Sequence, residues 1–144
     1  MTKEFELDLS KFQQALKKAP EIMYEAAKTG MHDALDDWVV QAKDVAPIAP
    51  KHGGTLRRGI KSEGVKEEEN ELIGEVSSVA IERDKKGNDF NYAYYIHELD
   101  AGGKQLRTPG TVKKYLDESA KQHQDKWMQW IEEEIEKSLK DAGW

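Results

Sequence analysis

The feature that most constrains the fold is a stripe of apolar residues between two prolines. From Met23 to Val45, apolar side chains recur at steps of three and four, which is the repeat of an amphipathic helix. Pro20 is tolerated in a first helical turn and Pro47 cannot continue a helix, so the pattern predicts a helix bounded by these two residues. Gly30 interrupts the stripe and makes the helix about 1 kcal/mol less stable than an alanine would.

Helical spacing also marks both ends of the chain. Residues 1–46 are predicted to be a helical segment, because a short stripe precedes Pro20. Residues 111–142 predict one long C-terminal helix, with Trp130 on the flank of its apolar face and Trp144 beyond its end. The two apolar faces are formed by Leu9, Phe12 and Leu16 in the first case and by Leu116, Ala120, Trp127, Ile131, Ile135, Leu139 and Ala142 in the second.

Residues 51–99, by contrast, have the period of two that is typical of strands. Residues 55–65 and 72–81 are predicted to be antiparallel strands joined by a charged hairpin loop. A third strand is predicted over residues 90–99, and both of its faces are apolar. A strand of that kind is either central in its sheet or covered by another chain. A loop over residues 100–110 precedes the last helix.

These patterns predict an α+β fold in which N-terminal helices and a long C-terminal helix pack on a small antiparallel sheet of three to four strands. The chain has 144 residues, the size of one domain, and we expect a single domain over residues 1–144. It is 8% aromatic, too aromatic for a disordered chain, and 35% charged, too charged for a membrane protein.

The charge balance argues against a free-standing DNA binder. The chain carries 28 acidic and 22 basic residues, for a net charge of −6, whereas duplex-DNA binders usually have a basic excess. Residues 47–62 are the exception, because they contain cations and no acid. In a strand, Arg57 and Arg58 would point to opposite faces, so one could reach a nucleic acid while the other pairs with a carboxylate. A solvated edge strand protected by charge is an equally good interpretation. The four cations are Lys51, Arg57, Arg58 and Lys61.

No catalytic or metal-binding motif is complete. The chain has no cysteine, which excludes thiolate nucleophiles and Cys-ligated zinc. His32 and Asp36 have the spacing of two ligands on a helix, but acidic neighbours indicate an ordinary polar face. His97-Glu98 begins like a zinc-protease motif, yet Ala101 stands where the second His is required. We therefore expect no enzyme, no metal and no cofactor. A hydrolase that uses His97 or His32 stays an alternative.

Three local patterns, in this order along the chain, resemble one family. Residues 47–60, ending in GGTLRRGI, look like its "P…T-G-x-L-R-x-S-I" segment. Residues 91–98, NYAYYIHE, are similar to its "Y-A-x-Y-V-H-E" strand, and residues 108–120 look like its "P-G-T…K-F-L-x-x-A" entry into the last helix. The family comprises the small neck proteins of long-tailed bacteriophages and prophages, the head–tail joining or tail-completion proteins. The resemblance covers about residues 10 to 141.

The resemblance implies a non-enzymatic minor structural protein of the virion. Such a subunit would be made in the bacterial host cytoplasm and would assemble as a ring at the head–tail junction. Its partners would be copies of itself and neighbouring neck or tail proteins, with DNA passing only loosely through a channel and no membrane involved. The residues expected at its interfaces are Arg57, Arg58, Lys61, Tyr95, His97, Glu98, Trp130 and Trp144.

Two other functions stay open. One is a minor capsid or head-associated protein. The other is a small nucleic-acid-associated regulator that uses the basic stretch at residues 47–62. Gly53 and Gly59 stand where the family usually has Thr and Ser, so no role of those hydroxyls is carried over to this chain.

Overall fold

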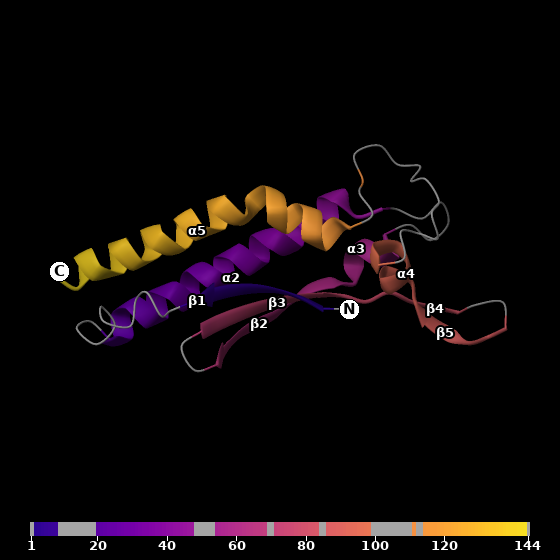
Figure 1. The fold of residues 1–144 in the computed structure, drawn as a ribbon, viewed down its shortest axis with the longest axis horizontal. Coiled ribbons are helices and arrows are strands. Elements are labelled where there is room, and N and C mark those ends of the chain that lie inside the picture. The colour runs from indigo at the N-terminus through magenta and orange to yellow at the C-terminus, as the bar shows by residue number, and fades with distance from the viewer. Residues whose placement is uncertain are drawn as a thin grey trace.

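Two long helices lie antiparallel to each other above a small sheet, which makes the fold a mixed α+β one (Figure 1). The computed structural model describes residues 2–8, 20–47, 54–68, 71–83, 86–98, 111 and 114–143. The elements in chain order are β1 (Thr2–Asp8), α2 (Pro20–Val45), α3 (Thr55–Arg58), β2 (Ile60–Glu68), β3 (Glu71–Ser78), β4 (Ile81–Arg83), β5 (Asp89–Asn91), α4 (Tyr92–Glu98) and α5 (Tyr115–Asp141).

The helix predicted between the two prolines is confirmed as α2, and it packs on both α5 and the sheet. Its apolar stripe is buried from Met23 to Ala42, with Met31 and Leu35 fully inaccessible, and Val45 at its end is partly buried. Gly30 lies where α5 crosses: a Cβ there would come within 2.8 Å of the Cα of Ile131. The glycine that weakens the helix in isolation therefore permits the close approach of the two helices.

The aromatic core joins three elements. Trp127 of α5 packs against Trp38 of α2, with ring centroids 5.8 Å apart, and edge-on against Phe5 of β1 at 5.9 Å. Both buried indole groups have hydrogen-bond partners. The Nε1 of Trp38 donates to the carbonyl of Leu116 at 3.0 Å, and that of Trp127 donates to a carboxylate oxygen of Asp37 at 2.7 Å. The two largest buried side chains are thus closely packed, and the polar atom of each indole group has a hydrogen-bond partner.

The larger sheet has three antiparallel strands in the order β1-β3-β2. Residues 2–8 form its edge strand β1, so the expected helical segment 1–46 is wrong over its first residues. Phe5 is buried between exposed Glu4 and Glu6, which is the alternation of a strand that is covered on one face. The predicted stripe of Leu9, Phe12 and Leu16 lies outside the described residues.

Two further stretches differ from the prediction. Residues 55–58 form the short helix α3, so the strand predicted to begin at residue 55 begins at Ile60. The strand predicted over residues 90–99 ends at Asn91, where α4 begins. The side-chain oxygen of Asn91 accepts the backbone N–H of Ala93 at 3.1 Å, the hydrogen bond that favours Asn before a helix.

The second sheet is a two-stranded hairpin that extends away from the rest of the molecule (Figure 1). Strands β4 and β5 pair from Ile81 opposite Asn91 to Arg83 opposite Asp89, and they contact chiefly each other and α4. We call residues 79–83 and 86–91 the arm, and we call α2, α5 and the three-stranded sheet the body. At the base of the arm, the N–H of Val79 donates to the carbonyl of Gly59 at 3.1 Å.

The C-terminal helix predicted over residues 111–142 is confirmed as α5, Tyr115–Asp141. Leu116, Trp127, Ile131 and Ile135 of its predicted apolar face are buried, whereas Ala142 is exposed just beyond the helix. The loop predicted at residues 100–110 lies outside the described residues.

Candidate assembly interface

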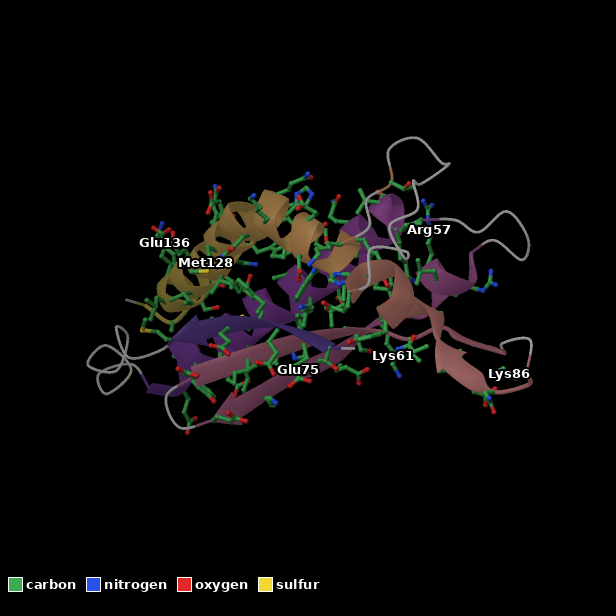
Figure 2. The ribbon with its side chains drawn as sticks, turned by 45° about the vertical axis from the view of Figure 1, so that its right-hand side comes forward. Arg57, Lys61, Glu75, Lys86, Met128 and Glu136 are labelled. Atoms are coloured by element: carbon green, nitrogen blue, oxygen red, sulfur yellow. The ribbon has the colours of Figure 1, made fainter. Side chains whose placement is uncertain are left out.

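Arg57 is part of the fold at the C-terminal end of α2 (Figure 2). Its Nε donates to the carbonyl of Ala46 at 3.0 Å, and one terminal nitrogen donates to the carbonyl of Asp44 at 3.3 Å. The last carbonyls of a helix have no partner within the helix, and the negative end of its dipole attracts a cation. The hydrogen bonds of Arg57 therefore hold α3 against the C-terminal end of α2.

Arg58 and Lys61 are placed differently from the prediction. Arg57 and Arg58 are consecutive residues of one helical turn, so they do not lie on opposite faces of a strand. Arg58 is exposed, and Lys61 on β2 is exposed and lies 3.6 Å from a carboxylate oxygen of Glu63. Both side chains lie on the surface and their interface roles stay predictions, while Arg57 is bound to its own chain.

His97 is a core residue, which contradicts its expected place at an interface. It is fully buried and packs edge-on against Tyr115 at 5.1 Å between ring centroids. Its Nδ1 lies 3.1 Å from a carboxylate oxygen of Glu98, and its Nε2 has no hydrogen-bond partner among the described residues. Burial lowers the pKa of His97, and the nearby carboxylates of Asp117 and Glu98 only partly oppose that effect.

Glu98 joins three elements at the edge of that buried histidine. The Nζ of Lys3 on β1 lies 3.3 Å from a carboxylate oxygen of Glu98 on α4 and 3.7 Å from one of Asp117 on α5. Burial acts to raise the pKa of Glu98, but the ammonium group of Lys3 and contact with His97 hold it below its usual value. These contacts are structural, and they engage the carboxylate that was expected to face a partner.

None of the three aromatic residues expected at an interface is exposed among the described side chains. Trp130 is partly buried against the core, with the Nζ of Lys126 at 5.1 Å from its ring centroid. It is therefore mainly a packing residue of α5. The side chain of Tyr95 and the whole of Trp144 lie outside the described residues, so their interface roles stay predictions.

Sequence reasoning missed the most exposed apolar group. Val79 is 41% exposed and Ile81 56% exposed on the arm, and Tyr94 at its base on α4 is 49% exposed. Two other large apolar side chains in the described part of the chain are exposed on α2, Ile22 and Val40. One signal was present: Val79 falls out of phase with the apolar residues of the preceding strand. Such side chains on a small projecting element indicate a contact surface.

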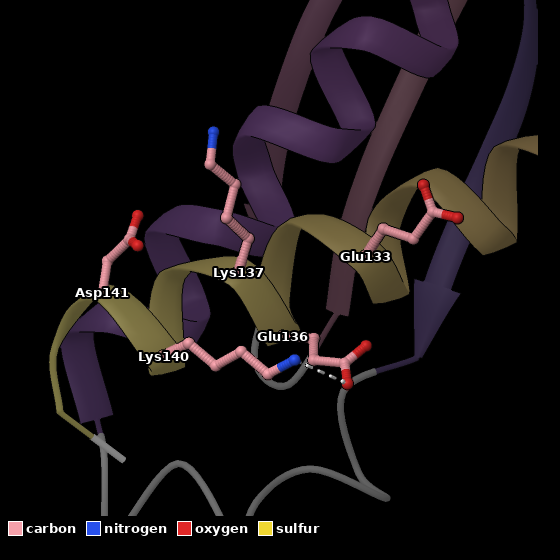
Figure 3. Close-up of a pocket in the computed structure, with 5 residues that line it drawn as sticks. All are labelled: Glu133, Glu136, Lys137, Lys140 and Asp141. Carbon is pink, nitrogen blue, oxygen red and sulfur yellow. Dashed lines mark ion pairs between the residues drawn. The ribbon is translucent and has the colours of Figure 1, made fainter.

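The described residues contain no group of three or more His, Asp or Glu side chains placed to hold a metal ion. The hollow in Figure 3 is the charged surface of α5, whose side chains project outward from a single helix, with Lys140 and Glu136 3.7 Å apart. Among these residues, none of the helices combines the length and apolarity that crossing a bilayer requires.

Comparison with known proteins identifies the family. Residues 10–97 match the model of the family described as "Bacteriophage HK97-gp10, putative tail-component". That stretch is more than half of the chain and includes α2, the larger part of the three-stranded sheet, the arm and most of α4. Neither the curated proteins nor the solved structures contain a match to this chain. The chain therefore belongs to the HK97-gp10-like family of bacteriophage tail components.

Proposed function

We propose that this protein is a head–tail joining or tail-completion subunit that acts by assembling into a ring at the phage neck. Its family makes it a phage structural protein, with a place in the virion and with other neck or tail proteins as partners. The observation that carries the proposal of self-assembly is the arm, a small element with exposed Val79 and Ile81 that reaches beyond the body. Burial of such side chains in a partner is favourable, since apolar surface leaves water.

The chemistry of the described residues supports binding and not catalysis. The histidine of the zinc-protease-like pair, His97, is buried beneath Tyr115, and His32 is exposed on α2. The basic stretch is also less available than its sequence indicates, because Arg57 donates to backbone carbonyls of α2. This favours a neck subunit, past which DNA slides, over a regulator that grips phosphates.

Removal of the protein tests the proposal. We expect a phage or prophage that lacks this chain to produce filled heads and complete tails that are not joined, as seen by negative-stain electron microscopy. Supplying the wild-type chain from a plasmid should restore joined, infectious particles. Normal particles in its absence would contradict the proposal, and defective heads would favour the minor capsid alternative.

Filter binding to duplex DNA at two salt concentrations separates the neck subunit from the regulator. Each phosphate neutralised by a cation contributes a slope of about −0.9 in log K against log salt. We expect weak binding with a small slope for the purified chain. A steep slope that disappears in the variant Arg58→Ala with Lys61→Ala would support the regulator and overturn the neck assignment.

A further inference from the structure

We infer that the arm of one copy docks into a hollow at the opposite end of a second copy. This inference names the surfaces of the proposed ring and rests on the proposed function. The donor surface is the arm with Tyr94 at its base. The acceptor surface is formed at the start of α2 and the end of α5, and we call it the α2 hollow. The residues that line the α2 hollow are Glu21, Ile22, Glu25, Ala26, Thr29 and Ser138.

The arm is expected to be more stable when a partner covers it. Its two strands are three residues each, and an isolated two-stranded hairpin is marginally stable in water. Val79 and Ile81, two residues apart, follow one another along the same side of an extended chain. Both are exposed in this chain alone, so the arm presents apolar side chains next to an unpaired strand edge.

The α2 hollow offers a matching apolar floor. Ile22 is 40% exposed, although it belongs to a helix whose other face is buried in the core. Ala26 and Ser138 are small, so the two helices leave a shallow, open depression beside it. A side chain the size of Ile81 can lie in such a depression and remove both isoleucines from water.

Position and charge favour a second copy as the occupant. The arm and the start of α2 lie at opposite ends of the elongated molecule (Figure 1), so one chain cannot close this contact on itself. Lys86 lies near the tip of the arm (Figure 2), and exposed Glu21 and Glu25 border the α2 hollow. A contact between two different patches repeats head to tail and gives a closed ring when the rotation per subunit permits.

The edge of the larger sheet formed by β2 is less suited to this role. The outer strand β2 carries exposed charged side chains along most of its length, among them Lys61, Glu63 and Lys66. Charges on an edge strand discourage pairing with another sheet. The head-to-tail contact avoids this cost.

Disulfide trapping tests the contact, since the wild-type chain contains no cysteine. Lys86→Cys and Glu25→Cys are made in separate full-length chains, purified, mixed at high concentration and oxidised. We expect a covalent dimer that contains one chain of each variant. The double variant Lys86→Cys with Glu25→Cys should give a ladder of covalent oligomers that ends at the closed ring.

Matched controls make the result specific. Glu63→Cys, at an exposed position on β2, should not link to Lys86→Cys. Ile81→Asp placed in the double variant should abolish the ladder of covalent oligomers. The helical circular dichroism signal, which comes mainly from α2 and α5, should be unchanged. Linking of Lys86→Cys to itself would show an arm-to-arm contact and overturn the inference, as would a failure of the mixed pair to link.

Failure of the docking inference can be distinguished from failure of the proposed function. If sedimentation shows oligomers of the wild-type chain and the mixed pair does not link, the docking inference is wrong and the ring can stand. If particles that lack the chain are joined and infectious, the proposed function is wrong whatever the cross-linking shows.

Discussion

The body buries most of its large apolar side chains within the chain, whereas the arm leaves apolar side chains exposed. In the body, α2, α5 and β1 meet around Trp38 and Trp127, whose indole groups are buried and hydrogen-bonded within the same chain. In the arm, Val79 and Ile81 stay exposed, and the two strands contact chiefly each other and α4. The body is therefore stabilised by its own contacts, whereas the arm leaves a surface that a partner can cover.

Stability and assembly are therefore located in different parts of the molecule. Substitutions in the body should unfold the chain and affect assembly only as a consequence. Substitutions in the arm should leave unfolding nearly unchanged and affect assembly directly. Four experiments test this separation, and their expected effects on the free energy of unfolding decrease from the first to the last.

Trp127→Ala is expected to have the largest effect. It removes the buried ring between Trp38 and Phe5 and leaves a cavity, with a loss of about 3–5 kcal/mol in the free energy of unfolding. Denaturant titration followed by circular dichroism measures the change. Trp130→Ala is the matched control on the same helix, and it should cost clearly less because Trp130 is only partly buried. Equal losses would refute the placement of the core.

Arg57→Ala should cost about 1.5–3 kcal/mol, the range for hydrogen bonds to a charged group. The reason is the loss of the donors to Ala46 and Asp44 at the end of α2. Lys61→Ala is the control: its ion pair with Glu63 is exposed, so we expect a change within about 0.5 kcal/mol. If the two variants unfold at the same denaturant concentration, Arg57 is not a structural residue.

His97 should make the body less stable in mild acid. Its pKa is lowered in the folded state from an ordinary value of 6.5, so the unfolded chain binds the proton more readily. The free energy of unfolding should therefore fall as the pH drops below about 6.5, with a slope of at most about 1.4 kcal/mol per pH unit, until the folded-state pKa is passed.

His97→Gln supplies the comparison, because Gln does not titrate. Denaturant titrations at several pH values should show that this part of the acid dependence is missing in the variant. The neighbours Glu98, Asp117 and Lys3 are the same in both proteins, so the difference between the two curves isolates the contribution of His97. Parallel curves for wild type and His97→Gln down to about pH 5 would mean that His97 is not held neutral by burial.

Ile81→Ser is expected to have the smallest effect on folding, within about 0.5 kcal/mol, because the side chain is mostly exposed. Its effect should appear in sedimentation, as weaker self-association at high concentration. Leu72→Ser, a change to a fully buried residue of the body, is the contrasting variant and should unfold the chain. A large loss of stability in Ile81→Ser would remove the distinction between body and arm.

Much of the body could be predicted from the sequence because helical periodicity is a local signal. The stripe between the two prolines places α2 nearly to the residue, and the stripe of α5 places the end of that helix, which begins at Tyr115, four residues after the predicted start. The importance of Gly30 could not be predicted, since it depends on the crossing of α5 at Ile131, a contact between residues far apart in sequence. Propensity alone gives only the cost of that glycine.

The end of the third predicted strand and the candidate interface were predicted poorly, because both depend on contacts that composition does not show. The aromatic run over residues 90–98 fits a strand by composition, and the side chain of Asn91 decides for a helix by accepting the N–H of Ala93. The strand assignment put Arg57 and Arg58 on opposite faces, while α3 places them in one turn. His97 is a polar residue followed by an acidic one, which indicates a surface position. Only its packing against Tyr115 in the folded chain shows that it is buried.

Amide hydrogen exchange of the wild-type chain, measured when dilute and when concentrated, shows whether the body folds through its own contacts and whether a second copy covers the arm. We predict that amides of β4 and β5 exchange rapidly in the dilute chain and become protected at high concentration, while those of α2 and α5 are slow in both. Arm amides that exchange equally at the two concentrations would contradict the account.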